Sequence, residues 1–184
     1  MTMKKGKCLC GYIVFEVQAN PIYMVNCFCR DCQIVSGSQF YGAYGVPLNS
    51  GLKNLSNEPS SYKVISDSGR ENTRKFCPKC GSRVWAEIPD LNLASVSGFA
   101  LEDRSHFKPT INYHIKQAPK WCLIDKKMTS YALYLDQTLQ SEGVNPKSEQ
   151  YFQKIDDSMR KQFPDYFGVS VEETQEKTQP SSVV

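Results

Sequence analysis

Seven of the eight cysteines fall into three tight groups, and this spacing constrains the fold more than any other feature of the sequence. The groups are CLC (Cys8 and Cys10), CFCRDC (Cys27, Cys29 and Cys32) and CPKC (Cys77 and Cys80). Packing of a core does not require cysteines at such short spacings, whereas a metal site does. The sequence therefore predicts metal binding, and only Cys122 stands outside the three groups.

The compartment expected for the chain supports this prediction. The start MTMKKGKCLC lacks the apolar stretch of a signal peptide, and no run reaches the roughly 18 apolar residues of a membrane span. We therefore expect a soluble, cytoplasmic protein. In a reducing compartment, clustered cysteines bind metal more often than they form disulfides.

The CPKC group resembles half of a zinc site at the tip of a β-hairpin. Its two thiolates can point at one ion, while Gly81 permits the tight turn that follows. Structural zinc takes four ligands, and CLC, also followed by a glycine, is the natural donor of the second pair. The sequence predicts a closed structural zinc site formed by Cys8, Cys10, Cys77 and Cys80.

Cys27, Cys29 and Cys32 then remain, one ligand short of a tetrahedral site. Three protein ligands with an open fourth position are typical of a catalytic zinc. Two candidates could complete the site: Cys122, which would make it structural, or an external thiol, which would make it a substrate site. Zinc deprotonates a bound thiol near neutral pH and leaves it nucleophilic. We expect two zinc ions per chain.

The fold class follows from short runs of β-branched and aromatic residues separated by turn residues. The expected strands are 12–17, 40–46, 61–65, 83–88, 92–98 and 110–115. Because no helices alternate with them, we expect a mainly β domain of short antiparallel strands over residues 1–136.

Residues 137–184 differ in character and are expected to form an extension. Asn145 and Pro146 can begin a helix over about 146–163, in which apolar residues recur at intervals of three and four. This amphipathic helix is expected to pack on the β domain, with partner binding as the alternative, and the polar tail after it is expected to be disordered.

The charge distribution argues against nucleic acid as a partner. Residues 1–138 hold 17 Lys and Arg against 11 Asp and Glu. Seven thiolates bound to two zinc ions carry a combined charge of about −3, which reduces that excess of six positive charges to about three. Such an excess is small for a nucleic-acid-binding protein. A small anionic ligand fits such an excess equally well.

The motifs together are similar to a known family. They are GKCLCG (Gly6–Gly11), CFCRDC followed by Ser36-Gly37, FCPKCG (Phe76–Gly81), and a later His114 and Trp121. In this order they resemble the glutathione-dependent formaldehyde-activating enzyme family, which also includes centromere protein V. The likeness runs from about residue 6 to residue 134.

The resemblance implies a β-tent fold with zinc knuckles, in which Cys27, Cys29 and Cys32 hold the catalytic zinc. It also implies a carbon–sulfur lyase that condenses formaldehyde with glutathione to S-(hydroxymethyl)glutathione. One departure is Phe28, because members often carry His there. The alternative function is a non-enzymatic zinc module for binding protein or chromatin.

Several other residues have expected roles. The candidate cations for holding the carboxylates of a glutathione-like thiol are Arg30, Arg74, Lys75 and Lys79, and the alternative is that they form an ordinary solvated face. His114 is expected to be a hydrogen-bonded structural histidine, with a proton shuttle as the alternative, and His106 is expected to be exposed. Tyr113 and Trp121 are expected to pack in the interior.

Overall fold

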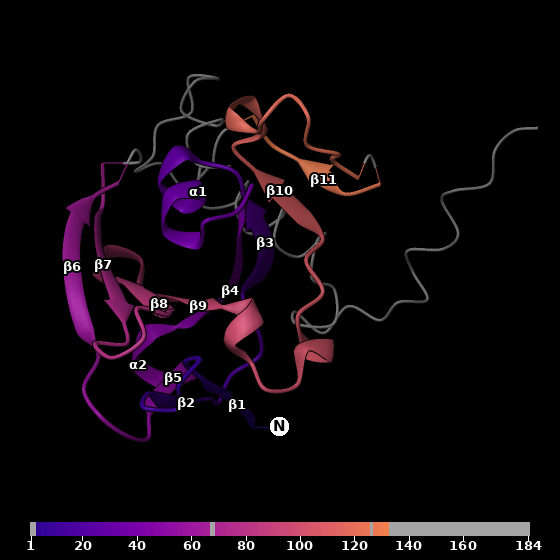
Figure 1. Ribbon diagram of the computed structural model, residues 1–184. Coiled ribbons are helices and arrows are strands. Elements are labelled where there is room, and N and C mark those ends of the chain that lie inside the picture. The colour runs from indigo at the N-terminus through magenta and orange to yellow at the C-terminus, as the bar shows by residue number, and fades with distance from the viewer. Residues whose placement is uncertain (1–2, 67–68, 126, 133–184) are drawn as a thin grey trace, which may run out of the picture.

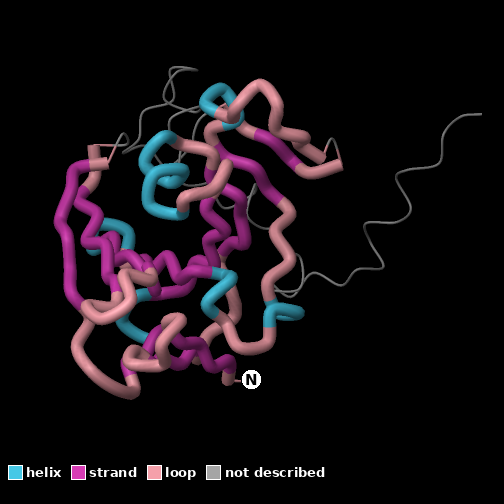
Figure 2. Tube along the Cα trace, in the orientation of Figure 1, coloured by secondary structure: helices cyan, strands magenta, loops and turns pink. Residues whose placement is uncertain are grey.

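The computed structural model describes residues 3–66, 69–125 and 127–132 of the 184-residue chain. Two sheets make up this part (Figures 1 and 2). The smaller sheet has three strands in the order β1-β2-β5, and the larger has eight in the order β11-β10-β3-β4-β9-β8-β7-β6. The expectation of a mainly β fold is confirmed.

The strands and helices are short. The strands are β1 (Lys4–Lys7), β2 (Val14–Val17), β3 (Tyr23–Cys27), β4 (Tyr41–Pro47), β5 (Leu52–Asn54), β6 (Ser60–Ile65), β7 (Glu71–Phe76), β8 (Arg83–Ile88), β9 (Leu93–Ser97), β10 (Ile111–Tyr113) and β11 (Thr129–Ser130). The helices are α1 (Arg30–Ser36), α2 (Leu48–Gly51) and the 3-10 turns η1 (Pro89–Leu91), η2 (Gly98–Ala100), η3 (Arg104–His106) and η4 (Ile115–Gln117). None of the helices described is long and apolar enough to cross a membrane.

The main core lies between the two sheets. Phe15 of β2 is fully buried, and its ring meets the Trp85 ring of β8 edge-on, with centroids 5.7 Å apart. Tyr44 and Val96, which are partners in the β4–β9 ladder, pack into the same cluster. Each fully buried large apolar side chain contributes about 2 kcal/mol, so this interface accounts for much of the stability of the fold.

A second apolar cluster covers the opposite face of the large sheet. Side chains alternate along a strand, so Val25 and Cys27 of β3 share a face with their partners Ala43 and Tyr41 of β4. Val25, Ala43 and Tyr41 form this cluster together with Ile111, and Cys32 packs against it. Helix α1 lies against β4 on the same side (Figure 1). This face therefore carries one of the cysteine groups.

Pairing is antiparallel throughout the described strands except at β10. This strand runs parallel to both β3 and β11. A long connection through η2 and η3, rather than a hairpin, joins β9 to β10. Strand β10 can therefore enter the sheet in either direction. The predicted strand at 110–115 is present but ends at Tyr113, because His114 takes a left-handed conformation with φ of 58°.

All six predicted strands are present, but other elements were not expected. The strands β1, β3, β5 and β11 and the helices α1 and α2 lie in stretches assigned to turns or left unassigned, and β7 was implied only as the first arm of the hairpin expected around CPKC. The helix predicted over 146–163 and the tail lie outside the described residues.

Candidate metal centres

Two groups of thiols converge in the structure, and they are those expected from the spacing. One contains Cys8, Cys10, Cys77 and Cys80, and the other contains Cys27, Cys29 and Cys32. In each group all the sulfur atoms lie within 4.8 Å of one another. The grouping is therefore found in the described residues, whereas zinc binding itself stays a prediction.

The first group joins the two sheets. Cys8 and Cys10 follow β1, and Cys77 and Cys80 lie in the hairpin loop between β7 and β8. The Sγ atom of Cys10 lies 3.6 Å from that of Cys8 and 3.7 Å from that of Cys77. Cys8 and Cys77 are buried, while Cys10 is exposed, so this site lies at the edge of the core.

Tight turns point these thiols inward. Gly11 and Gly81 both have positive φ, 75° and 71°, and their N–H groups donate to the carbonyls of Cys8 and Cys77 at 3.0 and 2.9 Å. Backbone N–H groups also reach sulfur: that of Ile13 lies 3.2 Å from Cys8 Sγ. Such donors favour a thiolate over a thiol, as a metal site requires. The donor set of four sulfurs fits a structural zinc.

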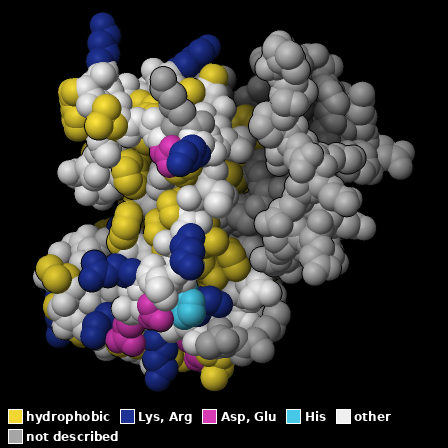
Figure 3. Space-filling view, turned by 90° about the vertical axis from the view of Figure 1, so that its right-hand side faces the viewer, with side chains coloured by type: hydrophobic (Ala, Val, Ile, Leu, Met, Phe, Trp, Pro, Cys, Tyr) yellow, Lys and Arg dark blue, Asp and Glu magenta, His cyan; other side chains and the backbone are white. Residues whose placement is uncertain are grey.

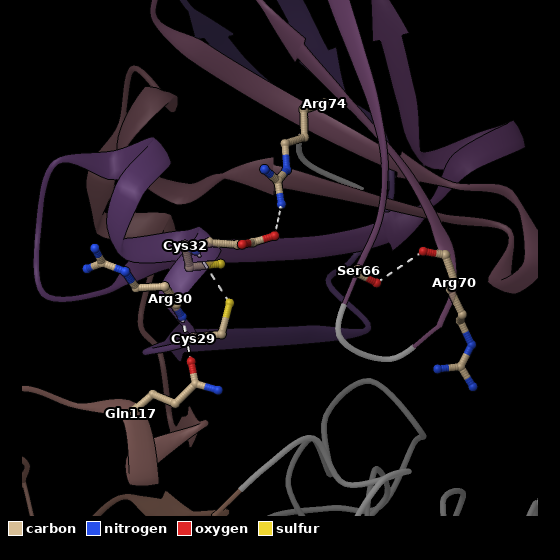
Figure 4. A network of polar contacts seen from close by, with 8 residues as sticks. Cys29, Arg30, Cys32, Ser66, Arg70, Arg74 and Gln117 are labelled. Carbon is tan, nitrogen blue, oxygen red and sulfur yellow. Dashed lines mark hydrogen bonds and ion pairs between the residues drawn. The ribbon is translucent and has the colours of Figure 1, made fainter.

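The second group lies where β3 passes into α1. Cys27 is the last residue of β3, Cys29 is the N-cap of α1, and Cys32 is in its first turn. The Sγ atom of Cys29 accepts from the Cys32 N–H at 3.4 Å (Figure 4). Gly37 ends the helix with φ of 61°, and Ser36 Oγ donates to the Cys32 carbonyl at 2.7 Å. The Ser-Gly pair after the cysteines thus closes the helix that holds them.

The electrostatics of the second group call for a cation. Hydrogen bonds from Cys27, and then from Cys32, lower the pKa of Cys29 to about 2, and the charge of His114 acts in the same direction. The hydrogen bond with Cys29, and then that with Cys32, instead raises the pKa of Cys27 well above its ordinary value, because Cys27 must keep its proton to act as a donor. Without a metal, this buried group therefore concentrates its negative charge on Cys29. A divalent ion would allow all three thiols to ionise, so the donor set fits zinc.

No fourth ligand completes the second group among the described residues. Cys122 is half-buried and belongs to neither group. His114 is 1% exposed and lies close enough to influence Cys29, but it does not join the cluster of ligand atoms. The described part of the chain thus supplies three sulfurs here and four at the first group.

A polar network holds α1 in place. Arg74 of β7 pairs with Asp31, which lies between Cys29 and Cys32 (Figure 4). On the other side, Gln117 Oε1 accepts from the Arg30 N–H at 2.6 Å. The helix that carries two of the three thiols is therefore tied both to the large sheet and to the segment after β10.

Three of the four cations expected to bind substrate have partners within the protein. Arg74 pairs with Asp31, Lys75 lies 3.6 Å from a Glu87 carboxylate oxygen, and Lys79 lies 3.9 Å above the Tyr12 ring. Figure 4 shows the Arg30 side chain extending away from the sulfur atoms. None of these four presents a spare guanidinium or ammonium group to the second group of thiols.

A fifth cation, Arg83, was not singled out from the sequence. Its guanidinium carbon lies 4.1 Å from the centroid of the Tyr41 ring, beside the second group. The hydrogen bond with Cys27 lowers the pKa of Cys32 and the charge of Arg83 acts in the same direction, but the hydrogen bond with Cys29 and burial raise this pKa overall to about 12. The sequence signal was present, because Arg83 follows the CPKCGS knuckle directly, but only the pairing of β7 with β8 shows which face it occupies.

The other expected packing roles have mixed outcomes. Tyr113 packs against the second apolar cluster, with its ring centroid 5.6 Å from that of Tyr131. The prediction for Trp121 is wrong, because this side chain lies in a loop after η4 and is 74% exposed. His106 is half-buried and lies 3.6 Å from Asp103. The face shown in Figure 3 carries separate basic side chains with acidic ones among them.

Comparison with known proteins gives one strong match. The sequence profile of the family described as glutathione-dependent formaldehyde-activating enzyme matches residues 3–117, more than half of the chain. No curated protein matches. Among solved structures, the crystal structure of a Rhodobacter sphaeroides protein is 20% identical with a TM-score of 0.42, and the alignment covers 54% of this chain and 88% of that one.

Proposed function

The chain belongs to the glutathione-dependent formaldehyde-activating enzyme family, and from this premise we propose that it is a zinc-dependent carbon–sulfur lyase. Its substrates in this proposal are a glutathione-like thiol and a small aldehyde such as formaldehyde. The observation that supports an enzyme over a purely structural protein is the difference between the two cysteine groups. The first offers four sulfurs, whereas the second offers three within the described residues.

The reaction forms one carbon–sulfur bond without any change of oxidation state. The sulfur of the thiol attacks the aldehyde carbon, the C=O double bond becomes a single bond, and the proton lost by the thiol ends on the new hydroxyl. A bound zinc ion would supply the positive charge that lowers the pKa of an external thiol at the fourth position. Cys27, Cys29 and Cys32 would hold this ion.

The protein's own residues would fix the geometry of that site. Cys29 and Cys32 are presented by the first turn of α1, and Cys27 is held by the β3–β4 ladder. The aromatic Phe28, 2% exposed, packs on Phe40 with ring centroids 5.4 Å apart and places an apolar wall beside the thiols. Low local polarity strengthens the attraction between an ion and its sulfur ligands.

Formaldehyde and glutathione form their adduct spontaneously, so the test measures the rate of exchange at equilibrium and compares it with the rate without protein. Exchange of carbon-13 label between formaldehyde hydrate and the adduct is measured by NMR, and the zinc-loaded protein should accelerate it. Cys29→Ser should reduce the exchange to the uncatalysed rate, while Cys122→Ser, outside both groups, should leave it unchanged. A wild-type protein that binds two zinc ions without accelerating exchange would instead indicate a binding module.

A further inference from the structure

Arg83 is placed beside the second cysteine group by the sheet register. It is the first residue of β8, and its guanidinium lies 4.1 Å from the centroid of the Tyr41 ring. Tyr41 is the partner of Cys27 in the β3–β4 ladder, and Cys32 packs against the cluster that contains Tyr41. The cation therefore lies over a ring that belongs to the cluster against which Cys32 packs.

Two of the three guanidinium nitrogens of Arg83 lack a hydrogen-bond partner among the described residues. These nitrogens are Nε and Nη1, and both are buried. A guanidinium does not lose its charge in proteins, so burial without an anion is costly. Arg74 differs, because Asp31 neutralises it at 2.5 Å. No acidic side chain among the described residues pairs with Arg83 in this way.

We propose that Arg83 is a specificity-determining residue that binds a carboxylate of the thiol entering the second cysteine group. The inference rests on the proposed function, because it requires an external thiol at that position. A guanidinium presents its N–H groups in a planar fork that matches a carboxylate, and the Tyr41 ring supports that plane from one side. A thiol that carries a carboxylate is therefore preferred to a neutral thiol of the same length.

A matched pair of thiols tests the preference. 3-Mercaptopropionate and 2-mercaptoethanol both place a two-carbon chain on sulfur, but only the first ends in a carboxylate. Binding to the cobalt-substituted protein is followed by the sulfur-to-cobalt absorption band, which reports a thiolate at the metal without any turnover. Wild-type protein should bind 3-mercaptopropionate at least about tenfold more tightly, the size expected for a charge-assisted contact.

Variants separate the role of Arg83 from that of charge in general. Arg83→Met should bring the ratio of the two affinities close to one, and Arg83→Lys should retain part of the preference. Lys63→Met is the control, because Lys63 is an exposed cation of β6 that pairs with Glu71. It should leave the ratio unchanged. Cobalt stoichiometry shows that each variant is folded, and if Arg83→Met fails to load cobalt, Arg83→Lys and the wild-type ratio still decide the question.

The outcomes distinguish this inference from the proposed function. Thiol binding by wild-type protein without preference for the carboxylate would overturn the inference alone. An equal loss of affinity for both thiols in Arg83→Met would also overturn it, and would assign Arg83 to balancing the charge of the bound sulfur. Failure of any thiol to bind cobalt in the wild-type protein would overturn the proposed function together with the inference.

Discussion

Oδ2 of Asp31 lies 2.5 Å from Nη2 of Arg74, and this ion pair joins helix α1 to strand β7. The Arg74 side chain is only 14% exposed and that of Asp31 is 35% exposed. Asp31 lies between Cys29 and Cys32 in the sequence, so an ion pair that fixes the position of Asp31 also fixes the backbone that carries two of the three thiols of the second group. The geometry of that group depends on a contact from a strand more than 40 residues away.

A double-mutant cycle on this pair should give a coupling of about 1–3 kcal/mol in the free energy of unfolding, because the pair is largely shielded from water. The variants are Asp31→Asn, Arg74→Met and the combination, each measured by urea denaturation with metal bound. Each single variant should also weaken the affinity of the second group for cobalt more than that of the first, because α1 loses its attachment to β7.

The control cycle uses Lys7 and Glu102, which lie 3.2 Å apart with side chains 54% and 45% exposed. Exposed pairs are screened by solvent, so their coupling should stay below about 1 kcal/mol. Equal coupling energies in the two cycles would contradict a special role for the Asp31–Arg74 pair.

Gly81 should tolerate asparagine better than alanine. Its φ is 71°, and a Cβ there would meet nothing within 4 Å, so the cost of a side chain is conformational rather than steric. The left-handed region costs a residue such as alanine about 1–2 kcal/mol, whereas asparagine adopts it more readily. Thermal unfolding of the zinc-loaded variants should therefore rank wild type above Gly81→Asn and Gly81→Asn above Gly81→Ala. Equal stability of all three would show that the turn can adopt another conformation.

The division of the cysteines could be predicted from sequence because ligand counting is local chemistry. Two pairs each followed by a glycine make four ligands, and three thiols remain. The position of CPKC at a hairpin tip was predicted correctly for the same reason, since the strands β7 and β8 flank it directly. These predictions needed no knowledge of long-range packing.

What could not be predicted depends on which surfaces meet. Strand β7 reads ENTRKF, which lacks the apolar residues of a typical strand, and it forms only because β6 and β8 pair with both of its edges. Trp121 is an apolar residue that was expected inside and lies outside. Arg83 faces the second group because of the register between Phe76 and Arg83, where a bulge shifts the ladder. No periodicity along the chain carries that information.

Replacing one thiol of each group by serine should have different effects on the stability of the protein and on the number of zinc ions that it binds. Cys77 is fully buried in the main core and its group joins β1 to the β7–β8 hairpin, so Cys77→Ser should lose metal and much of the fold together. Cys29→Ser should keep one zinc per chain and a cooperative unfolding transition. Zinc is counted by atomic emission and folding by near-ultraviolet circular dichroism. Simultaneous loss of both metals in Cys29→Ser would contradict two independent sites.

Tyr44 should make the protein less stable at alkaline pH. Burial in the main core raises its pKa to about 12, from an ordinary value near 10, and its hydroxyl is buried without a hydrogen-bond partner. The phenol therefore stays protonated in the folded state while it ionises in the unfolded state. The contribution of the protonated Tyr44 phenol to the free energy of unfolding is fully present below about pH 10. It falls by about 1.4 kcal/mol per pH unit as the pH rises toward 12.

The measurement compares urea unfolding of wild type and Tyr44→Phe at pH 9.5 and pH 11.5. Phenylalanine cannot ionise, so the variant should gain about 2 kcal/mol relative to wild type between these two values. Tyr62→Phe, made at a tyrosine that is 60% exposed, corrects for the loss of a phenol elsewhere on the protein. Because the thiols are the same in all three proteins, their ionisation cancels from the comparison. A stability difference between Tyr44→Phe and wild type that does not change with pH would mean that the Tyr44 hydroxyl reaches water in the folded state.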